Sequence, residues 1–314
     1  MNNKKMAKEN TIELNNVTEF KCGLVTVIAR PNVGKSTLVN FITGQKIAIT
    51  TPTAQTTRKQ IKGIFTDKEA QIIFIDTPGV HKPLNKLGEY LTEQSIDAIK
   101  DTDLILFLVD ANDPAGKGDS WIVENCIKKV KTPVIIVANK IDKIQNETKK
   151  EANICTYKTL FDENVPVLRV SAKTGKNVDE LIKIIKEKLP VGLPLYDEDT
   201  ITDQNMRMIA SEVIREKIIL NTKDEIPHSV AVLIDDYKTE GNLDKIKATI
   251  FVSADSQKGI IIGKQGSMLK KIGMEARLEL EEIIEGKVFL ELFVKVKKNW
   301  QKDKNALKLL GYEQ

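Results

Sequence analysis

A run of nine residues near the amino end has the composition and spacing of a phosphate-binding loop. It follows an apolar stretch and consists of Ala29, Arg30, Pro31, Asn32, Val33, Gly34, Lys35, Ser36 and Thr37. Successive backbone N–H groups of such a loop surround phosphate oxygens at a helix N-terminus, where the helix dipole favours anions. We expect Lys35 to bridge two phosphates and the Ser36 hydroxyl to bind Mg²⁺. Ala29 stands where this motif more often has glycine, whereas Gly34 is needed for close backbone approach.

A second segment with chemical character ends another apolar run and consists of Asp76, Thr77, Pro78, Gly79 and Val80. We expect Asp76 to hold Mg²⁺ through water and the Gly79 N–H to reach a terminal phosphate. These residues alone would also suit a type I turn, but their place downstream of the phosphate-binding loop favours a nucleoside triphosphate site. Ras-type enzymes have a water-orienting glutamine just after this segment, and Val80 can neither donate nor accept a hydrogen bond. Hydrolysis is therefore expected to be slow without help.

Two neighbouring side chains are candidates for that help. We expect Asn32 to help hold K⁺ near the β- and γ-phosphates. There the positive charge of the ion would stabilise the transition state, as an arginine finger does in other GTPases. His81 follows Val80 in the chain and is a candidate general base. We favour the interpretation that it is a solvated residue of the switch segment.

A base-recognition motif follows two later apolar runs. It consists of Asn139, Lys140 and Asp142 after the first run, and Ser171, Ala172 and Lys173 after the second. Guanine presents an N1–H and an N2 amino group on one edge, and the Asp142 carboxylate can accept from both. Adenine has an acceptor and a C–H at that edge, so polar atoms would be left unpaired. We expect the Ala172 N–H to contact guanine O6; the alternative for Asp142 is a helix cap.

The carboxyl-terminal third contains a second glycine signature, Gly263, Lys264, Gln265 and Gly266, directly before an amphipathic segment. Glycine-x-x-glycine between two helices is the backbone clamp of KH domains, where small residues let a nucleic-acid backbone approach closely. A plain turn between helices is the alternative, but the preceding Ile-Ile-Gly and the following apolar spacing favour the clamp. We expect it to bind single-stranded RNA with a salt-dependent affinity.

Basic residues gather around this clamp although the net charge of the chain is only +4. Lys258, Lys264, Lys270 and Lys271 are followed by glutamates that cancel them in the total. A second group of lysines, at 295–304, surrounds Trp300. Stacking of a base on an exposed aromatic ring contributes about 1–3 kcal/mol, so Trp300 is a candidate RNA contact. The alternative that stays open is a packing residue that anchors the C-terminal segment.

Length and composition limit the class of protein that can carry these motifs. A chain of 314 residues suggests two domains, at about 150 residues per domain. An apolar fraction of 41% with 29% charged residues is typical of a globular protein. Three scattered cysteines argue against a disulfide framework or a metal site, and fit a reducing compartment. The first residues are polar and no apolar run could cross a bilayer, so we expect a soluble intracellular protein.

The motifs before residue 190 each follow a short run rich in Val, Ile and Leu, which is typical of strands buried on both faces of a parallel sheet. These runs are Gly23–Ala29, Gln71–Asp76, Leu104–Asp110, Pro133–Asn139 and Val165–Ser171. Segments with helical spacing, such as Val178–Leu189, lie between them. The alternation predicts a doubly wound α/β domain with its ligand site at the carboxyl ends of the strands.

The pattern changes after the helix-breaking stretch Pro190–Pro194. Beyond it we expect a helix at Gln204–Leu220, strands at Ser229–Asp235 and Lys245–Ser253, a long helix at Ser267–Glu285 and a final strand at Lys287–Lys297. Strands with helices segregated from them indicate a separate α+β domain. The predicted limits are a polar leader at 1–20, a nucleotide domain at 21–190, a linker at 191–204, an RNA-binding domain at 205–300 and a C-terminal segment at 301–314.

From about Cys22 to Tyr312 the chain resembles the Era-like GTPase family, in the translation-factor-related branch of the small GTPases. Its second half resembles the type II KH arrangement. The resemblance implies that Ile49–Gly63 is a first switch, centred on Gln55, Thr56, Thr57 and Arg58. Thr57, with Thr56 as second choice, would then bind Mg²⁺ and sense the γ-phosphate; a polar loop without that role is the alternative.

The resemblance also implies partners and a place of action. It implies binding to the 3′ end of 16S rRNA, assistance to assembly of the small (30S) ribosomal subunit, and a monomer in the cytoplasm. Peripheral association with the inner face of the cell membrane is a family tendency, although the sequence shows no amphipathic anchor. Two other classes stay open: an RNA-binding scaffold whose nucleotide site is structural, and an ATP-using enzyme, against which Asp142 speaks.

Overall fold

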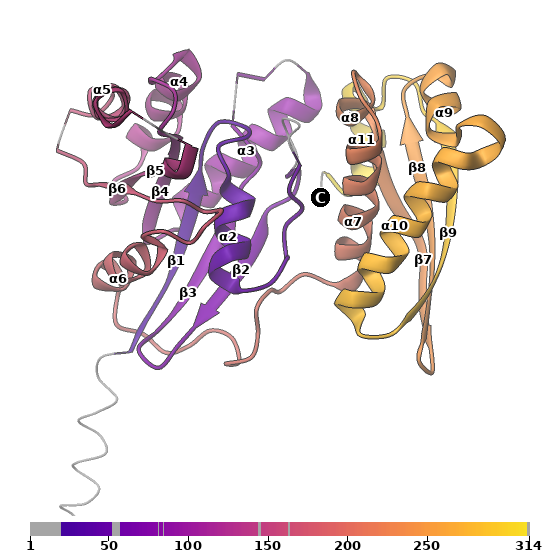
Figure 1. The fold of residues 1–314 in the computed structure, drawn as a ribbon, viewed down its shortest axis with the longest axis horizontal. Helices are drawn as coiled ribbons and strands as arrows, with labels where there is room; N and C mark the ends of the chain where they lie inside the picture. Colours follow the sequence, from indigo (N-terminus) through magenta and orange to yellow (C-terminus); the bar gives the residue numbers. More distant parts are fainter. Residues whose placement is uncertain are drawn as a thin grey trace, which may run out of the picture.

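The computed structural model describes residues 20–51, 57–80, 82–83, 85–143, 146–162 and 164–312, which form two sheet-containing domains (Figure 1). Nearly all of the predicted leader, together with Gln55, Thr56 and His81, lies outside the described residues. Within the described part of the chain, no helix is long and apolar enough to cross a membrane.

The first domain is built on a six-stranded sheet with the order β2-β3-β1-β4-β5-β6. Its strands are β1 (Lys21–Ile28), β2 (Ile61–Thr66), β3 (Ala70–Asp76), β4 (Leu104–Asp110), β5 (Val134–Asn139) and β6 (Val167–Arg169). Every pairing is parallel except that of β2 with β3. The predicted α/β fold with a mostly parallel sheet is therefore confirmed, and the antiparallel edge strand β2 is an addition to the five predicted strands.

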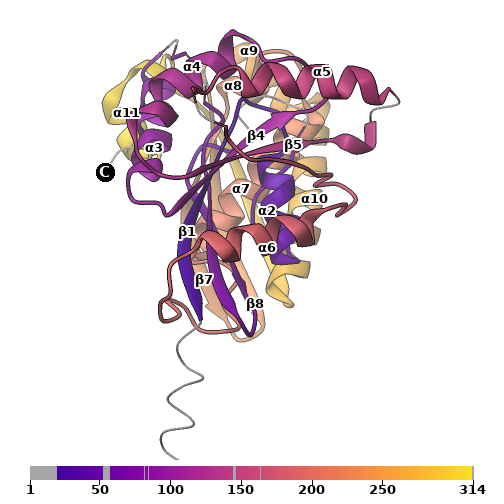
Figure 2. The same cartoon turned by 90° about the vertical axis from the view of Figure 1, so that its left-hand side faces the viewer.

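Helices cover both faces of this sheet, and Figure 2 views it from the side of α5 and α6. They are α2 (Lys35–Thr43), α3 (Lys86–Lys100), α4 (Lys117–Asn125), α5 (Glu147–Lys158) and α6 (Val178–Lys188). Alternate residues of β4 pack in opposite directions, with Leu106 in the core under α2 and α6 and Phe107 in the core under α3, α4 and α5. This two-sided burial explains why the central strands read as continuous apolar runs.

The second domain has a three-stranded sheet with the order β7-β8-β9 and helices packed against it. Its elements are α7 (Met206–Asn221), α8 (Ile226–Ser229), β7 (Ala231–Glu240), β8 (Leu243–Val252), α9 (Asp255–Ile262), α10 (Ser267–Ile284) and β9 (Lys287–Val296). Strand β8 pairs antiparallel with β7 and parallel with β9. Buried residues of α7 and α10, such as Ile214 and Leu280, share one core with the sheet. The predicted α+β domain is confirmed.

The stretch between the domains has no helix or strand of its own, and it runs along the outer side of β2 and β3. The Gln71 side chain holds the backbone of Leu195 and Tyr196 through bonds of 2.7–2.9 Å. The backbone N–H of Ile64 in β2 donates to the Ile201 carbonyl at 2.9 Å. The edge strand that the sequence did not indicate thus receives part of its hydrogen bonding from the linker.

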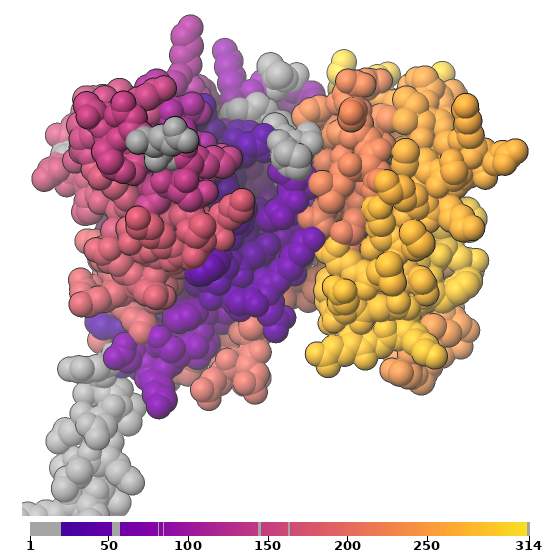
Figure 3. Space-filling view, in the orientation of Figure 1, coloured from indigo at the N-terminus to yellow at the C-terminus, as the bar shows by residue number. Residues whose placement is uncertain are grey.

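The C-terminal segment lies between the domains and packs on both. Helix α11 (Lys304–Leu309) and its flanks form a small apolar core with Leu87 and Leu91 of α3 and Phe251 of β8. In Figure 3 the first domain meets the orange surface that includes α7. The domains are therefore joined by a packed interface as well as by the linker.

Trp300 belongs to this interface core, which corrects its prediction as an RNA contact. Its side chain is 0% exposed, its Nε1–H donates to the Ser229 carbonyl at 2.9 Å, and its ring stacks on Tyr312 with centroids 6.0 Å apart. A base cannot stack on a ring whose faces are already covered. The alternative, a residue that anchors the C-terminal segment, is what the structure shows.

Candidate functional site

The predicted phosphate-binding loop joins β1 to α2 and lies at the carboxyl end of the sheet. Gly34 has a φ of 106°, and a Cβ at this position would lie 2.5 Å from Asn139 Nδ2. Glycine is thus required by backbone conformation and by space. The loop borders a cavity of about 340 Å³ whose lining includes Pro31, Asn32, Gly34, Lys35, Ser36, Thr37, Thr57, Gly79 and Lys140. Ala29 is fully buried in the core beside β1, so its methyl group replaces the more usual glycine without entering the cavity.

Three predicted Mg²⁺ ligands converge at the floor of this cavity. Ser36 Oγ donates to Asp76 Oδ2 at 2.7 Å, and the Thr57 hydroxyl lies 2.9 Å from Ser36 Oγ and 3.3 Å from Asp76 Oδ2. Asp76 is fully buried, and its Oδ1 has no hydrogen-bond partner among the residues that the structure describes. Two hydroxyls and a carboxylate are the hard oxygen donors that Mg²⁺ prefers. The residues present therefore fit this ion.

Burial also shifts the pKa values of the two charged side chains at the site, Lys35 and Asp76. Burial raises the pKa of Asp76, against the opposing effects of Lys35 and the two hydroxyls. Burial likewise lowers the pKa of Lys35, against the opposing effect of Asp76. Each charged form lacks part of its solvation, and a bound phosphate and cation would supply the missing counter-charges.

The predicted second switch begins at the end of β3 and rests on the phosphate-binding loop. The Val80 N–H donates to the Ala29 carbonyl at 3.0 Å, and a Cβ on Gly79 would lie 3.1 Å from Pro31 Cα. Thr77 donates to the carbonyl of Val27, so its hydroxyl is used in the fold. The Val80 side chain is 1% exposed and belongs to the apolar core. Its side chain is therefore enclosed by apolar residues, and it is also unable to hydrogen-bond to an attacking water.

The base-recognition residues form one connected network. Asn139 donates to the Val33 carbonyl at 2.8 Å and accepts from the Ala172 N–H at 2.9 Å. Ser171 Oγ donates to Asp142 Oδ1 at 2.7 Å, which orients the exposed carboxylate. The helix-cap alternative for Asp142 does not hold, because the cap of α5 is Asn146. Lys173 is exposed beside this network.

Two acidic residues that the sequence reasoning missed orient basic residues at the nucleotide site. Asp110 at the end of β4 accepts from Lys140 Nζ at 2.8 Å, and the same ammonium donates to the Asn32 carbonyl at 2.6 Å. Asp119 on α4 accepts from Arg30 Nε at 2.8 Å and is itself buried. The signal for Asp110 was available, since it is an acidic residue at the carboxyl end of a predicted strand.

The predicted RNA clamp lies between α9 and α10. Gly263 has a φ of 73° and a Cβ there would lie 2.8 Å from the Met268 nitrogen, whereas Gly266 has a φ of 79° with open space around it. Lys264, Gln265 and Lys270 are exposed, and Lys258 is partly exposed. A groove of about 570 Å³ runs from Gly266 along α10, with Lys270, Met274 and Arg277 on its wall. Arg277 was not predicted, because the glutamates near it in the sequence make that segment acidic and gave no sign of a basic contact.

Comparisons with known proteins agree with both halves of this description. A family described as "50S ribosome-binding GTPase" matches residues 24–140, and the KH domain family matches residues 225–301. GTPase Era of Ruminiclostridium cellulolyticum is 49% identical over 295 residues, which are 94% of this chain and 98% of that protein.

Two crystal structures resemble the whole fold. One is Era in complex with MgGDPNP and nucleotides 1506–1542 of 16S ribosomal RNA, with a TM-score of 0.91. The other is an Aquifex aeolicus Era variant bound to GDP and AlF4⁻, with a TM-score of 0.90. Each is 41% identical to this chain and covers 94% of it, and the match spans 100% of each of those chains. The chain belongs to the Era family of GTPases.

Proposed function

We propose that this protein is a guanine-nucleotide switch that hydrolyses GTP to GDP and phosphate, and that it binds the 3′ end of 16S rRNA to assist assembly of the 30S subunit. The observation that carries the first part is the convergence of Ser36, Thr57 and Asp76 beside the buried Lys35. A binding site for diphosphate alone would not need a ligand from the first switch. The domain limits given above are part of the proposal.

Each group has a definite task in this proposal. The backbone N–H groups before α2 and the Lys35 ammonium bind the phosphates, and Asp142 and the Ala172 N–H select guanine. Ser36, Thr57 and Asp76 would hold Mg²⁺, which neutralises charge on the phosphate oxygens when bound. Thr57 and Gly79 are the two switch residues that a γ-phosphate would hold, and loss of that phosphate would release them.

The buried Val80 leaves the attacking water without a protein group at the usual position. We propose that K⁺, held with the help of Asn32, supplies positive charge near the transferred phosphoryl group. The test is the GTPase rate in KCl against NaCl at equal ionic strength. A faster rate in KCl supports the proposal, and equal rates contradict it.

The RNA part rests on the exposed clamp and the groove beside α10, together with the RNA complex of the related Era protein. A clamp with positive-φ glycines and exposed lysines suits a phosphate backbone that approaches from solvent. RNA crosslinked in cells and sequenced should concentrate at the 3′ end of 16S rRNA. Reads concentrated elsewhere would contradict the ribosomal assignment and leave the GTPase assignment intact.

Two measurements separate this function from the alternatives. Competition binding should show displacement of labelled GDP by GTP and no displacement by an equal concentration of ATP. Turnover should be slow for the isolated protein and faster with small ribosomal subunits. An RNA-binding scaffold with a structural nucleotide site would show no turnover in either condition.

We further propose that the protein acts as a monomer in the cytoplasm and that any membrane association is peripheral. Light scattering after size-exclusion chromatography should give the mass of one chain. Flotation with vesicles of anionic lipid tests the membrane part: release of bound protein by high salt supports peripheral association, and bound protein that high salt does not release contradicts it.

A further inference from the structure

Adjacent residues of the first switch are buried in different domains. Thr57 is 4% exposed and lies with Ser36 and Asp76 at the nucleotide site. Arg58 is 0% exposed, and its guanidinium enters the KH domain. One peptide bond therefore separates a residue that would sense the γ-phosphate from a residue enclosed by the RNA-binding domain.

The KH domain holds Arg58 through three backbone carbonyls in and directly after α8. Arg58 donates to the carbonyl oxygens of Val230 at 2.6 Å, His228 at 2.9 Å and Pro227 at 3.2 Å. Trp300 binds the remaining carbonyl of this stretch, that of Ser229, and Arg58 lies over the Trp300 ring at 5.8 Å from its centroid. The last carbonyls of a helix have no intrahelical partner. The planar guanidinium is suited to satisfy several of them at once.

These hydrogen bonds, together with burial, hold the Arg58 side chain in one position. Burial lowers the pKa of Arg58, and Tyr312 counteracts part of the effect. A buried guanidinium is stable only while its hydrogen bonds are made, because an unpaired buried charge is strongly unfavourable. Movement of Arg58 out of the KH domain would break the hydrogen bonds that its guanidinium donates to three carbonyl oxygens. The backbone at Thr57 is therefore tied to the KH domain.

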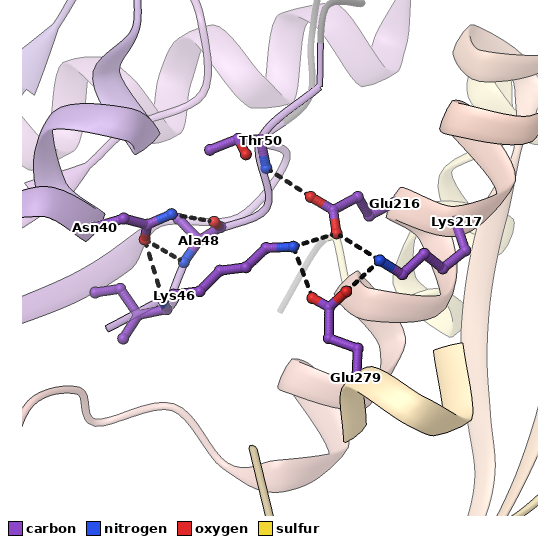
Figure 4. Close-up of polar contacts among 8 residues, drawn as sticks. Asn40, Lys46, Ala48, Thr50, Glu216, Lys217 and Glu279 are labelled. Carbon is purple, nitrogen blue, oxygen red and sulfur yellow. Dashed lines mark hydrogen bonds and ion pairs between the residues drawn. The ribbon is translucent and has the colours of Figure 1, made fainter. Parts of the chain in front are cut away.

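A second contact holds the other side of the same loop, as Figure 4 shows. Glu216 on α7 is 1% exposed at its side chain, accepts from the Thr50 N–H at 3.0 Å and pairs with Lys46 at 2.5 Å. Lys46 also pairs with Glu279 on α10 at 2.7 Å. Asn40 on α2 fixes the loop from the nucleotide side by binding the backbone of residues 47 and 48.

The two contacts connect the nucleotide site to elements that carry the RNA clamp. Helix α2 begins at the phosphate-binding loop, and α10 begins directly after Gly266. Glu279 lies twelve residues along α10 from its first residue, about 18 Å at 1.5 Å per residue. The path from phosphate to clamp thus runs along α2, across the hydrogen bonds of Lys46 and Glu216, and along α10.

We propose that Arg58 and Glu216 are positioning residues through which the KH domain places Thr57 at the nucleotide site. This inference rests on the proposed function. The docked KH domain stabilises the switch conformation in which Thr57 lies with Ser36 and Asp76, and only a nucleotide with a γ-phosphate gains from that conformation. By reciprocity, the γ-phosphate stabilises the docked arrangement of the KH domain, so GTP and RNA affect each other's affinity through these two side chains.

The test measures the dissociation constants of a non-hydrolysable GTP analogue and of GDP, both with Mg²⁺. Arg58→Ala should weaken binding of the GTP analogue by about tenfold and binding of GDP by less than about twofold, within the usual range of coupling between sites. Arg58→Lys keeps the charge without the planar fork, so it should recover part of the loss. Glu216→Gln keeps an acceptor for Thr50 but loses the charge that pairs with Lys46, and should give a smaller loss in the same direction.

Two variants control for damage to the KH domain. Gln301→Ala removes a side chain that donates to the same His228 carbonyl as Arg58 but does not belong to the switch. Glu275→Gln alters a carboxylate on α10 that accepts from Asn221 on α7 within the KH domain. Both controls should leave the preference for the GTP analogue over GDP unchanged.

A second readout uses an RNA oligonucleotide with the 3′-terminal sequence of bacterial 16S rRNA. The ratio of its affinities in the presence of the GTP analogue and of GDP should fall toward one in Arg58→Ala. An equal loss of both nucleotides in Arg58→Ala, with no recovery in Arg58→Lys, would show a structural role only and overturn the inference. An unchanged preference in Arg58→Ala and Glu216→Gln would overturn it as well.

Different results would contradict the proposed RNA function and the proposed role of Arg58 and Glu216. If wild-type protein does not bind the RNA, the proposed RNA function is contradicted, and the nucleotide measurements still decide the role of Arg58 and Glu216. If Arg58→Ala does not fold, Arg58→Lys and Glu216→Gln decide the question, because both preserve side-chain volume.

Discussion

The nucleotide site and the RNA clamp both use glycine to admit a phosphate, but they hold their polar groups in opposite ways. Lys35, Asp76 and Ser171 are 6%, 0% and 0% exposed, and hydrogen bonds between distant segments fix the site. The clamp presents Lys264 and Gln265 to solvent, with open space at Gly266. The first site is part of the core of its domain, and the second is a surface feature. Substitutions should therefore change folding and binding together in the first site, and binding alone in the second.

The largest effect is expected for Gly34→Ala. The new Cβ would lie 2.5 Å from Asn139 Nδ2, at a φ of 106° that side chains rarely adopt. Strained backbone of this kind costs about 1–3 kcal/mol, and displacement of Asn139 also disturbs the Ala172 contact. We expect guanine-nucleotide affinity to fall by more than about 100-fold, since each lost charge-assisted hydrogen bond costs about 1.5–3 kcal/mol. Isothermal titration with GDP and thermal unfolding measure the two effects. Normal affinity in a stable variant would contradict the description of this site.

The matched change in the other region is Gly266→Asp. No atom of the described residues lies within 4 Å of a Cβ there, and aspartate tolerates the left-handed backbone at φ 79° better than most residues. The carboxylate would face the RNA backbone, and such like-charge contacts cost several kcal/mol, which is about a 100-fold loss of affinity. RNA binding should be abolished in a gel-shift assay while GDP affinity and the unfolding temperature stay at wild-type values. Loss of RNA binding and GDP binding together would indicate misfolding.

The same contrast explains which features could be predicted from the sequence. The central strands, such as β4, were predicted because burial on both faces produces continuous apolar runs. Strand β2 was not, because it is a partly exposed edge strand that contains Gly63 and pairs antiparallel. The motif residues around Lys35 and Asp142 are local and were found by spacing.

Residues whose role depends on contact between the domains could not be found in this way. Arg58 and Glu216 are charged residues that local patterns place on a surface, but each is buried and makes hydrogen bonds to the other domain. Trp300 could be exposed or buried on sequence alone, and the packing of Tyr312 and α8 decided it. Burial of these residues is a property of tertiary packing between segments far apart in the chain.

An intermediate effect is expected for Asp142→Asn, which tests the base specificity of the nucleotide site. The amide nitrogen would face the N1–H and N2 amino group of guanine with donors instead of acceptors. Xanthine has a carbonyl oxygen at C2, which can accept from that nitrogen. We expect GDP affinity to fall by about 10- to 100-fold, from loss of one charge-assisted hydrogen bond, and xanthosine diphosphate affinity to rise. Ser171→Ala removes the orienting bond to Asp142 and should lower GDP affinity less, without a gain for xanthine.

The smallest effect is expected for Lys270→Ala, and it separates the two regions by their response to salt. Lys270 is exposed on α10 beside the groove, so its ammonium can neutralise one phosphate of a bound RNA. Each neutralised phosphate of a single strand contributes about −0.7 to the slope of log K against log salt concentration, so the slope should become shallower by about that amount. Lys270 lies outside the nucleotide site, so GDP affinity should keep its wild-type salt dependence in this variant. Lys186→Ala, on α6 of the first domain, removes one lysine of the same charge far from the clamp and should leave the RNA slope unchanged. An unchanged slope in Lys270→Ala would mean that RNA binds to a different face of the protein and that the clamp is not the RNA-binding site.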